Sequence, residues 1–332
     1  MNSLNKNKID VTVLITSISQ REITIETARY YSQICTEVIL VDEQKPYLSE
    51  IDIKALKKAG IIYIPYSYNG DLHKRSLCSA YEKRLIAAKE SQKKYVVHSN
   101  HDERYTYNGL LGCINELEQN DELIFCAGQA IAVRRDDLKI HYSRPQERLY
   151  GYQNINNIQQ RLYYHAETYA LVAHYSVWRK KSYINVTEKT ISIHNQMPST
   201  TMMEEVIFEF AANLAGNSKT IPKLYWIRNR LNPPLHSSKE KGKHVFKIIE
   251  NKLDSLFEDI DNIKMNIIIN NLKKNFPHIG PTFKDKTIIF IKQNVRKLVK
   301  KKKILDIDTL IADKKITYEK DDLSNALKSI GF

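Results

Sequence analysis

Short apolar runs alternate with segments of helical periodicity from residue 11 to residue 132 of the chain. The apolar runs are rich in β-branched side chains and span residues 11–16, 38–41, 61–64 and 95–98. Between and after them, apolar residues recur at helical spacing over 25–34, 51–59, 77–90 and 109–118. Continuous apolar strands separated by helices are typical of a parallel sheet that is covered on both faces. The pattern therefore predicts a doubly wound α/β domain, with a further strand over 123–132.

The pattern is less regular from residue 133 to residue 203, where we expect only a strand-like segment over 169–178. A helix over 203–214 and a strand over 224–227 follow. After Pro233-Pro234 the chain becomes polar and basic, and its last segment, 317–332, has the pattern of a short helix. We therefore expect one domain over 9–236 and a basic, mainly helical extension over 237–332.

The formal net charge of +13 favours an anionic partner, which could be a nucleic acid, a membrane surface or a phosphorylated substrate. Nucleic acid is disfavoured because no zinc-finger, helix-turn-helix or RNP pattern occurs. Residues 288–303 hold seven Lys and Arg and no acidic residue, interleaved with apolar residues. This stretch fits either an anionic bilayer surface or a solvated helix packed on the protein. Because no apolar run reaches about 18 residues, we expect a soluble cytoplasmic protein, peripheral to the membrane at most.

A cluster of side chains able to bind a metal follows the fourth predicted strand. His101, Asp102 and Glu103 offer an imidazole nitrogen and carboxylate oxygens, a set that suits Mn²⁺ or Mg²⁺. The cluster lies at the carboxyl end of its strand, where open α/β sheets bind ligands. The alternative is an ordinary polar loop in which Asp102 caps the next turn. Spacing alone leaves both interpretations open.

Other polar residues have two interpretations each. Asp42 ends the second strand at the same edge of the sheet, as a ligand for a base or ribose or as a turn former. Glu204 and Glu205 begin a helix, where they either favour its dipole or supply a general base. His236 and Arg228 are either surface residues or ligands of a diphosphate or metal.

The order of these elements resembles that of the GT-A glycosyltransferases. More narrowly, the chain is similar to a bacterial group of surface-polysaccharide glycosyltransferases related to family 2. In that group a run like ADDDF…xGL follows the fourth strand, and Asn100-His101-Asp102-Glu103-Arg104 with Gly109-Leu110 takes its place here. The segments 149–152, 161–162, 169–172, 204–205, 215–217 and 224–228 resemble later parts of the group. The resemblance covers roughly residues 9–236, and it lies in the order of individually weak motifs.

The resemblance implies a GT-A fold, with a mostly parallel, Rossmann-like sheet, and an enzyme that moves a sugar from a nucleotide-diphospho-sugar to a saccharide or lipid-linked acceptor. Capsule, lipopolysaccharide or a related surface glycan would be the product, formed with inversion. Glu205 would be the base, next to Glu204. The donor would bind across Thr16, Ser17, Asp42, Arg75, His101, Asp102 and Arg228, with Lys74 as an alternative to Arg75.

A divalent cation, Mn²⁺ or Mg²⁺, would be held by Glu103, His101 and His236. The sequence departs from the group's acidic triplet, because His101 replaces its first Asp and Glu103 its last. Metal binding with altered geometry and loss of metal binding are therefore both open. Transfer of an activated polyol or polyol phosphate on the same fold, and nucleic-acid binding, are the alternative functions.

Overall fold

The computed structural model describes residues 7–17, 20–67, 75–101, 103–136, 139–143, 172–195, 203–229 and 317–330, and within 157–165 residues 157, 158, 160, 161 and 165. The segment 288–303 and most of the predicted extension lie outside this part of the chain. Among the described residues, no helix is both long and apolar enough to cross a membrane.

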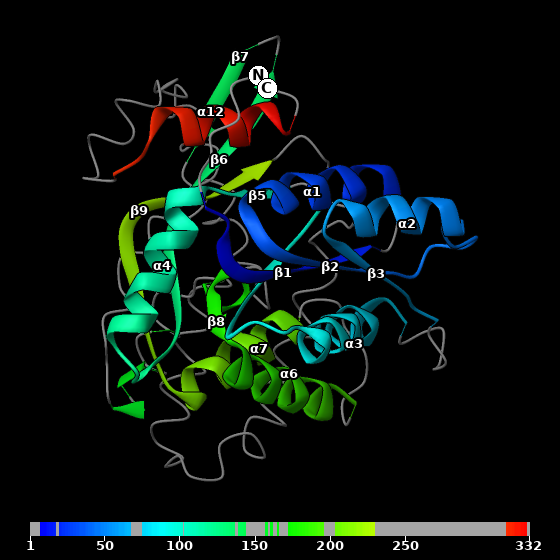
Figure 1. The fold of residues 1–332 in the computed structure, drawn as a ribbon. Helices are drawn as coiled ribbons and strands as arrows, with labels where there is room; N and C mark the ends of the chain where they lie inside the picture. The colour runs from blue at the N-terminus through cyan, green and yellow to red at the C-terminus, as the bar shows by residue number, and fades with distance from the viewer. Residues whose placement is uncertain are drawn as a thin grey trace, which may run out of the picture.

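The first half of the chain has the predicted alternation of strands and helices. The elements are β1 (Ile9–Ser17), α1 (Arg21–Ile34), β2 (Cys35–Asp42), α2 (Glu50–Lys58), β3 (Ile61–Pro65), α3 (Arg75–Glu90) and β4 (Tyr95–Ser99). The four strands are parallel and lie in the order β3-β2-β1-β4. Most side chains of β1, β2 and β4 are buried because helices cover both faces: α1 and α2 lie on one side, and α3 on the other (Figure 1). Because these four strands are parallel, all of them end at the same edge of the sheet.

The second half completes a mixed sheet. Its elements are β5 (Glu103–Tyr105), α4 (Tyr107–Gln119), β6 (Leu123–Asp136), β7 (Lys139–Ser143), η2 (Ala173–Tyr175), β8 (Val177–Arg179), α6 (Lys180–Asn195), α7 (Met203–Ala215) and β9 (Asn217–Asn229). The order of the nine strands is β3-β2-β1-β4-β8-β6-β9-β5, with β7 paired to β6. The first four strands pair in parallel, as does β6 with β9, whereas β8 is antiparallel to both β4 and β6 and β5 is antiparallel to β9.

Helix α6 lies in the region that was predicted to be irregular, and that prediction was wrong. Its buried residues are Tyr183, Val186, Thr187, Thr190 and His194, so three of the five are polar. The hydroxyls of Thr187 and Thr190 donate to main-chain carbonyls four residues earlier, which lets them be buried. A search for apolar periodicity misses such a stripe. The strand expected over 169–178 was also wrong in part: of its described residues, 173–175 form a 3₁₀ turn, and 177 and 178 belong to β8.

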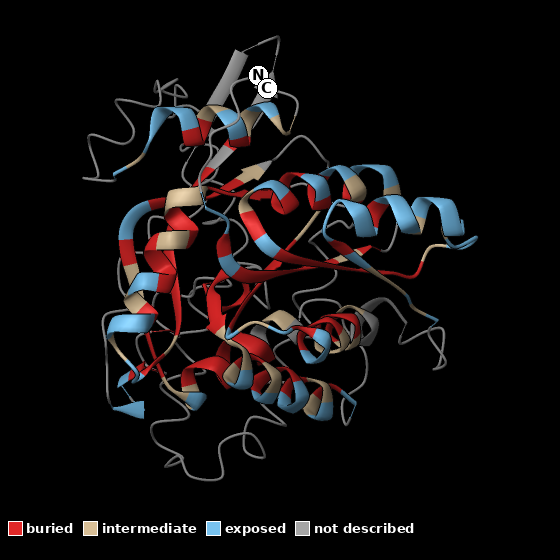
Figure 2. Ribbon diagram, in the orientation of Figure 1, coloured by how far each residue is buried: buried red, intermediate tan, exposed pale blue. Residues whose placement is uncertain are grey.

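One core runs through the whole sheet. Figure 2 shows buried residues along the strands and on the inner faces of the helices, with exposed residues on the outer faces. A last helix, α12 (Lys320–Lys328), confirms the helical pattern predicted near the end of the chain. It packs on this core through Leu323 and Ala326. A β-bridge between Lys223 and Thr317 joins the segment just before α12 to β9.

Candidate active site

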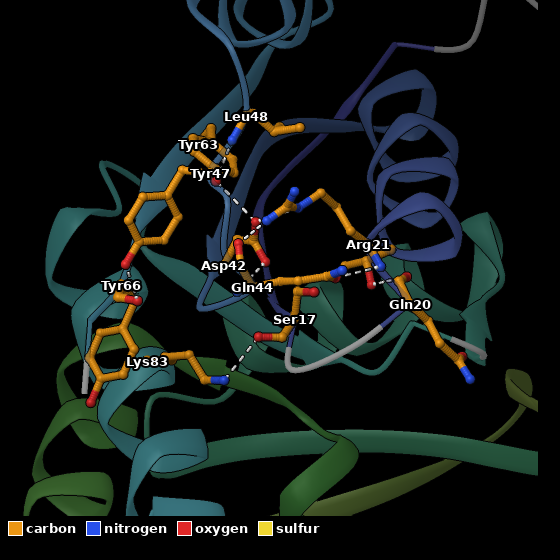
Figure 3. Close-up of polar contacts among 11 residues, drawn as sticks. Ser17, Gln20, Arg21, Asp42, Gln44, Tyr47, Leu48, Tyr63, Tyr66 and Lys83 are labelled. Carbon is orange, nitrogen blue, oxygen red and sulfur yellow. Dashed lines mark hydrogen bonds and ion pairs between the residues drawn. The ribbon is translucent and has the colours of Figure 1, made fainter. Parts of the chain in front are cut away.

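The first part of the candidate site is the edge where β1 and β2 end. Ser17 and Asp42 are paired in the register of the two strands, as the sequence predicted for the strand ends. Asp42 is fully buried, and its Oδ2 accepts hydrogen bonds from Arg21 Nε at 2.7 Å and Tyr63 Oη at 2.9 Å. The backbone N–H of Gln44 donates to its Oδ1 at 3.1 Å. Figure 3 shows these groups around the carboxylate, which therefore shapes the loop after β2.

A buried lysine supports the same edge from below. Lys83 on α3 donates from Nζ to the carbonyl oxygen of Ser17 and to Glu43 Oε2, both at 3.0 Å (Figure 3 shows the former). Burial lowers the pKa of the Lys83 ammonium, and the charge of Glu43 opposes this shift. The hydroxyl of Ser17 is buried and has no hydrogen-bond partner among the described residues. Thr16, the other residue predicted here, is half-buried in β1.

The second part is the loop between β4 and β5. Ser99 pairs with Ile15 of β1, so this loop leaves the sheet at the edge where β1 and β2 end. Glu103 opens β5 and is buried, directly opposite Arg228 of β9, with 3.6 Å between its Oε1 and Arg228 Nε. Asn100 Nδ2 donates to Glu103 Oε2 at 3.2 Å and to Tyr175 Oη at 3.1 Å. The structure thus joins two predicted site residues, Glu103 and Arg228, through strand pairing.

The other predicted residues near this loop are only partly described. His101 is half-buried, and its carbonyl oxygen accepts a hydrogen bond from Thr27 Oγ1 of α1. Arg75 begins α3, but its side chain lies outside the described part of the chain. Three further predicted residues, Lys74, Asp102 and His236, lie entirely outside the described part of the chain. In the part of the chain that the structure describes, no three His, Cys, Asp or Glu side chains form a group able to hold a metal.

The third part is the inner face of α7. Glu205 and Glu209 lie one helical turn apart, and the side chain of Glu204 lies outside the described part of the chain. Burial raises the pKa of Glu205, whereas the charges of Arg84 and Arg228 lower it. A carboxyl group whose pKa is raised by burial is a candidate for a functional role, and the position of Glu205 at the start of α7 also suits the helix dipole.

Glu209 was not anticipated from the sequence. Its carboxylate accepts hydrogen bonds from the backbone N–H groups of His174 at 2.9 Å and Ala173 at 3.1 Å, so it holds η2. Burial raises its pKa to about 8, although these two hydrogen bonds oppose the shift. A sequence signal does exist, since an acid four residues after Glu205 lies between two Phe residues.

Two histidines and an arginine, all buried, lie close to Tyr81 and to one another. The rings of His98 and His174 lie 5.2 Å apart, and burial lowers the pKa of both far below its usual range. Tyr81 Oη lies 3.2 Å from His174 Nδ1, and the Arg84 guanidinium lies 4.7 Å from the Tyr81 ring centre. The positive charges that lower the pKa of Glu205 are those of Arg84 and Arg228.

Tyr175 connects the second and third parts. Its ring stacks on Trp226 with centroids 4.0 Å apart, and its hydroxyl accepts the hydrogen bond from Asn100. Burial raises its pKa well above the usual range, and the charges of Glu103 and Glu205 raise it further. Since Tyr175 belongs to η2, which Glu209 holds, this residue joins the loop with Glu103 to the inner face of α7.

No protein-family model matches the chain, and no curated protein matches it in sequence. Its fold is similar to that of S. aureus TarS 1–349, with a TM-score of 0.52, 9% identity and coverage of 97% of this chain and 81% of that one. The crystal structure of TarS 1–349 in complex with UDP-GlcNAc matches with a TM-score of 0.52 at 11% identity, over 80% of this chain and 71% of that chain. The complex with UDP matches with a TM-score of 0.51 at 9% identity, over 97% and 81%. This likeness confirms the predicted GT-A-like α/β fold.

Proposed function

We propose that this protein is a glycosyltransferase that moves a sugar from a nucleotide-diphospho-sugar to a saccharide or lipid-linked acceptor in bacterial surface-glycan synthesis. The observation that carries the proposal is the Glu103–Arg228 pair, which Asn100 and Tyr175 join to the helix that bears Glu205, on a GT-A-like fold. The crystal structures of the similarly folded TarS with UDP-GlcNAc and UDP support a nucleotide-sugar donor. Capsule and lipopolysaccharide are the glycans that the resemblance implies.

The donor would lie along the carboxyl ends of β1, β2 and β4. The unpartnered Ser17 hydroxyl would meet the nucleoside, next to the loop that Asp42 shapes. Arg228 would face the diphosphate, because its guanidinium fork matches phosphate oxygens and its side chain is 36% exposed. Thr16, Arg75, His101 and Asp102 are the further donor contacts that we propose.

Glu205 would act as the general base, with Glu204 beside it. Its carboxylate would take the proton of the acceptor hydroxyl as that oxygen forms a bond to the anomeric carbon. The bond from this carbon to the donor phosphate would break on the opposite side, so the nucleoside diphosphate leaves and the configuration inverts. The raised pKa of Glu205 suits this role, since a base is most effective when its pKa lies near the working pH.

The ligand set suits a hard divalent cation in part. The described residues supply one buried carboxylate, Glu103, and a half-buried imidazole, His101. Mg²⁺ keeps several waters and takes substrate phosphate oxygens, so few protein ligands are needed. We propose that Glu103, His101 and His236 hold Mn²⁺ or Mg²⁺. When bound, the ion supplies charge that stabilises the leaving diphosphate.

Titration with nucleotide sugars tests the proposal. UDP-, GDP- and CMP-sugars and the free nucleotides are titrated by calorimetry, with and without Mn²⁺. Tight binding of one nucleotide class is the expected result, and a nucleotide-activated polyol in the panel tests the polyol alternative on the same fold. Failure of the whole panel, together with salt-sensitive binding of DNA or RNA, would overturn the proposal. Vesicles with and without anionic lipid separately test the predicted membrane contact of 288–303.

A further inference from the structure

Arg104 joins the donor loop to the end of the chain. This residue of β5 is 1% exposed, and its guanidinium donates in two directions. Toward the loop, NH1 donates to the carbonyl oxygens of His101 at 3.2 Å and Glu103 at 2.9 Å. Toward the C-terminus, Nε donates to Ser329 Oγ at 2.9 Å and NH2 to the Ser329 carbonyl at 3.0 Å. One buried cation therefore links two segments that are 225 residues apart.

A second contact holds α12 on the other side of β5. The Asp322 carboxylate accepts hydrogen bonds from the backbone N–H groups of Tyr107 and Asn108, both at 2.8 Å. These groups belong to the first turn of α4, where N–H groups have no partner within the helix and a negative charge is favoured. Residue 317 adds backbone hydrogen bonds to residues 222 and 224 of β9, both at 2.9 Å. Helix α12 is thus fixed to the elements that follow and face the loop.

We propose that Arg104 is a positioning residue for the donor loop and that α12 is the support on which it acts. This inference rests on the proposed function, because it gives the loop of residues 100–103 the role of donor site. Arg104 reaches the loop through main-chain carbonyls, so it sets the path of the backbone that carries His101 and Glu103 without touching substrate. Thr27 holds the same His101 carbonyl from the side of α1. When the residues of a site are already held in their binding positions, less free energy is lost in ordering them as the ligand binds.

Coupling between α12 and the loop has a reciprocal consequence. If α12 stabilises the loop in its binding form, a nucleotide that binds the loop must stabilise α12 by the same factor. Hydrogen exchange reports both, because the protection of an amide measures the free energy of local opening. The full-length protein is compared with Arg104→Met, Arg104→Lys and Ser329→Ala, of which Ser329→Ala is the mildest. Arg29→Met, an exposed site on α1, is the matched control.

The first measurement uses protein without nucleotide. Arg104→Met is expected to raise amide exchange in the loop about tenfold or more, the factor for one lost charge-assisted hydrogen bond, with smaller effects for Arg104→Lys and Ser329→Ala. Arg29→Met should leave it unchanged. If the loop amides of both Arg104→Met and Ser329→Ala exchange at the wild-type rate, the inference is overturned, even if α12 itself exchanges faster. This outcome does not depend on whether the protein binds nucleotide sugars.

The second measurement adds UDP with Mn²⁺ and then UDP-GlcNAc. In the wild type, nucleotide should slow exchange in 320–330 as well as in the loop, and Ser329→Ala should weaken both effects. Protection of the loop alone in the wild type would contradict the coupling. If the wild type binds neither compound nor any other nucleotide sugar, the proposed function fails, while the first measurement still decides whether Arg104 positions the loop.

Discussion

Glu103 and Arg228 face each other across the β5–β9 pair, a buried carboxylate opposite a partly exposed guanidinium, with 3.6 Å between Oε1 and Nε. An ion pair of this kind can be exchanged: a diphosphate that enters from the exposed side would compete with Glu103 for the same fork of donors. A cation that binds Glu103 would release Arg228 toward the phosphate. The pair therefore links the proposed ligand of the cation, Glu103, to the proposed ligand of the diphosphate, Arg228.

Replacing Arg228 should weaken diphosphate binding and spare nucleoside binding. Arg228→Met removes the proposed phosphate donor, and one charge-assisted hydrogen bond corresponds to about ten- to a hundredfold in affinity. We therefore expect the Kd of UDP, or of whichever nucleoside diphosphate the panel selects, to rise by this factor, with the Kd of the nucleoside unchanged. Calorimetry measures both. Lys219→Met, which removes a surface cation paired with Glu116, is the control, and equal UDP affinity in wild type and Arg228→Met would exclude the role.

Glu205→Gln should abolish transfer and keep donor binding. The amide preserves the shape of the side chain but cannot take a proton, so kcat should fall by about 10²–10⁴. The Kd of the donor should stay within about twofold, because the base acts on the acceptor. Release of the nucleotide product measures turnover, and Glu188→Gln on the exposed side of α6 is the control. Full turnover in Glu205→Gln would remove this residue from the mechanism.

Glu209 should make stability fall as pH rises. Its pKa is raised by burial from 4.5 to about 8, so between these values the folded protein holds a proton that the unfolded chain has lost. Stability is then present below the lower pKa and lost toward the upper one, with a slope of at most about 1.36 kcal/mol per pH unit. His98 and His174 have lowered pKa values and act in the opposite sense, but only below about pH 6.5.

The measurement is the free energy of unfolding in urea from about pH 7 to about pH 8.5, where those histidines are mostly neutral in both states. Glu209→Gln should flatten the decline seen in the wild type, since Gln does not titrate. The control is Glu118→Gln, an exposed residue paired with Lys94. An unchanged slope in Glu209→Gln would show that this carboxyl does not govern the pH dependence.

Local pattern predicted the first half of the fold because its strands are apolar and its helices are regular. The edge with Ser17, Asp42 and the loop after β4 followed from topology, since parallel strands end on one side. Helix α3 shows where the pattern stops being informative. Its period was right, but Lys83 is also buried, and its partners Ser17 and Glu43 lie outside this helix. Sequence spacing does not contain those partners.

Strand β5 could not be predicted for a related reason. Its three residues are Glu103, Arg104 and Tyr105, which have neither an apolar run nor an alternation. The strand exists because β9, more than a hundred residues later, pairs with it and supplies Arg228 opposite Glu103. Tyr31 adds to this by accepting a hydrogen bond from the Tyr105 N–H at 2.9 Å. Glu103, which we propose as a metal ligand, was therefore singled out in the sequence, while its ion pair and the backbone supports of its strand required the fold.

Two glycines of α4 should differ sharply in their tolerance of alanine. A Cβ at Gly109 would lie 2.5 Å from Tyr225 Cα and 2.6 Å from the Leu224 carbonyl oxygen, which are backbone atoms that cannot rotate away. At Gly112 the nearest atoms are the side-chain carbons Ile221 Cδ1 at 2.8 Å and Lys223 Cδ at 2.9 Å. The close approach of α4 to β9 therefore explains why glycine stands at position 109, without reference to any ligand.

Gly109→Ala should lower the free energy of unfolding by about 1–3 kcal/mol or more, as overpacking does. Gly112→Ala should change it by less than about 1 kcal/mol, because side chains can move and alanine gains about 0.5–1 kcal/mol of helix propensity over glycine. Urea unfolding of both variants provides the comparison, each serving as the control for the other. Since β9 carries Arg228, displacement of this strand should also raise the Kd of UDP in Gly109→Ala. Equal stability of the two variants would mean that the contact between α4 and β9 is not closely packed.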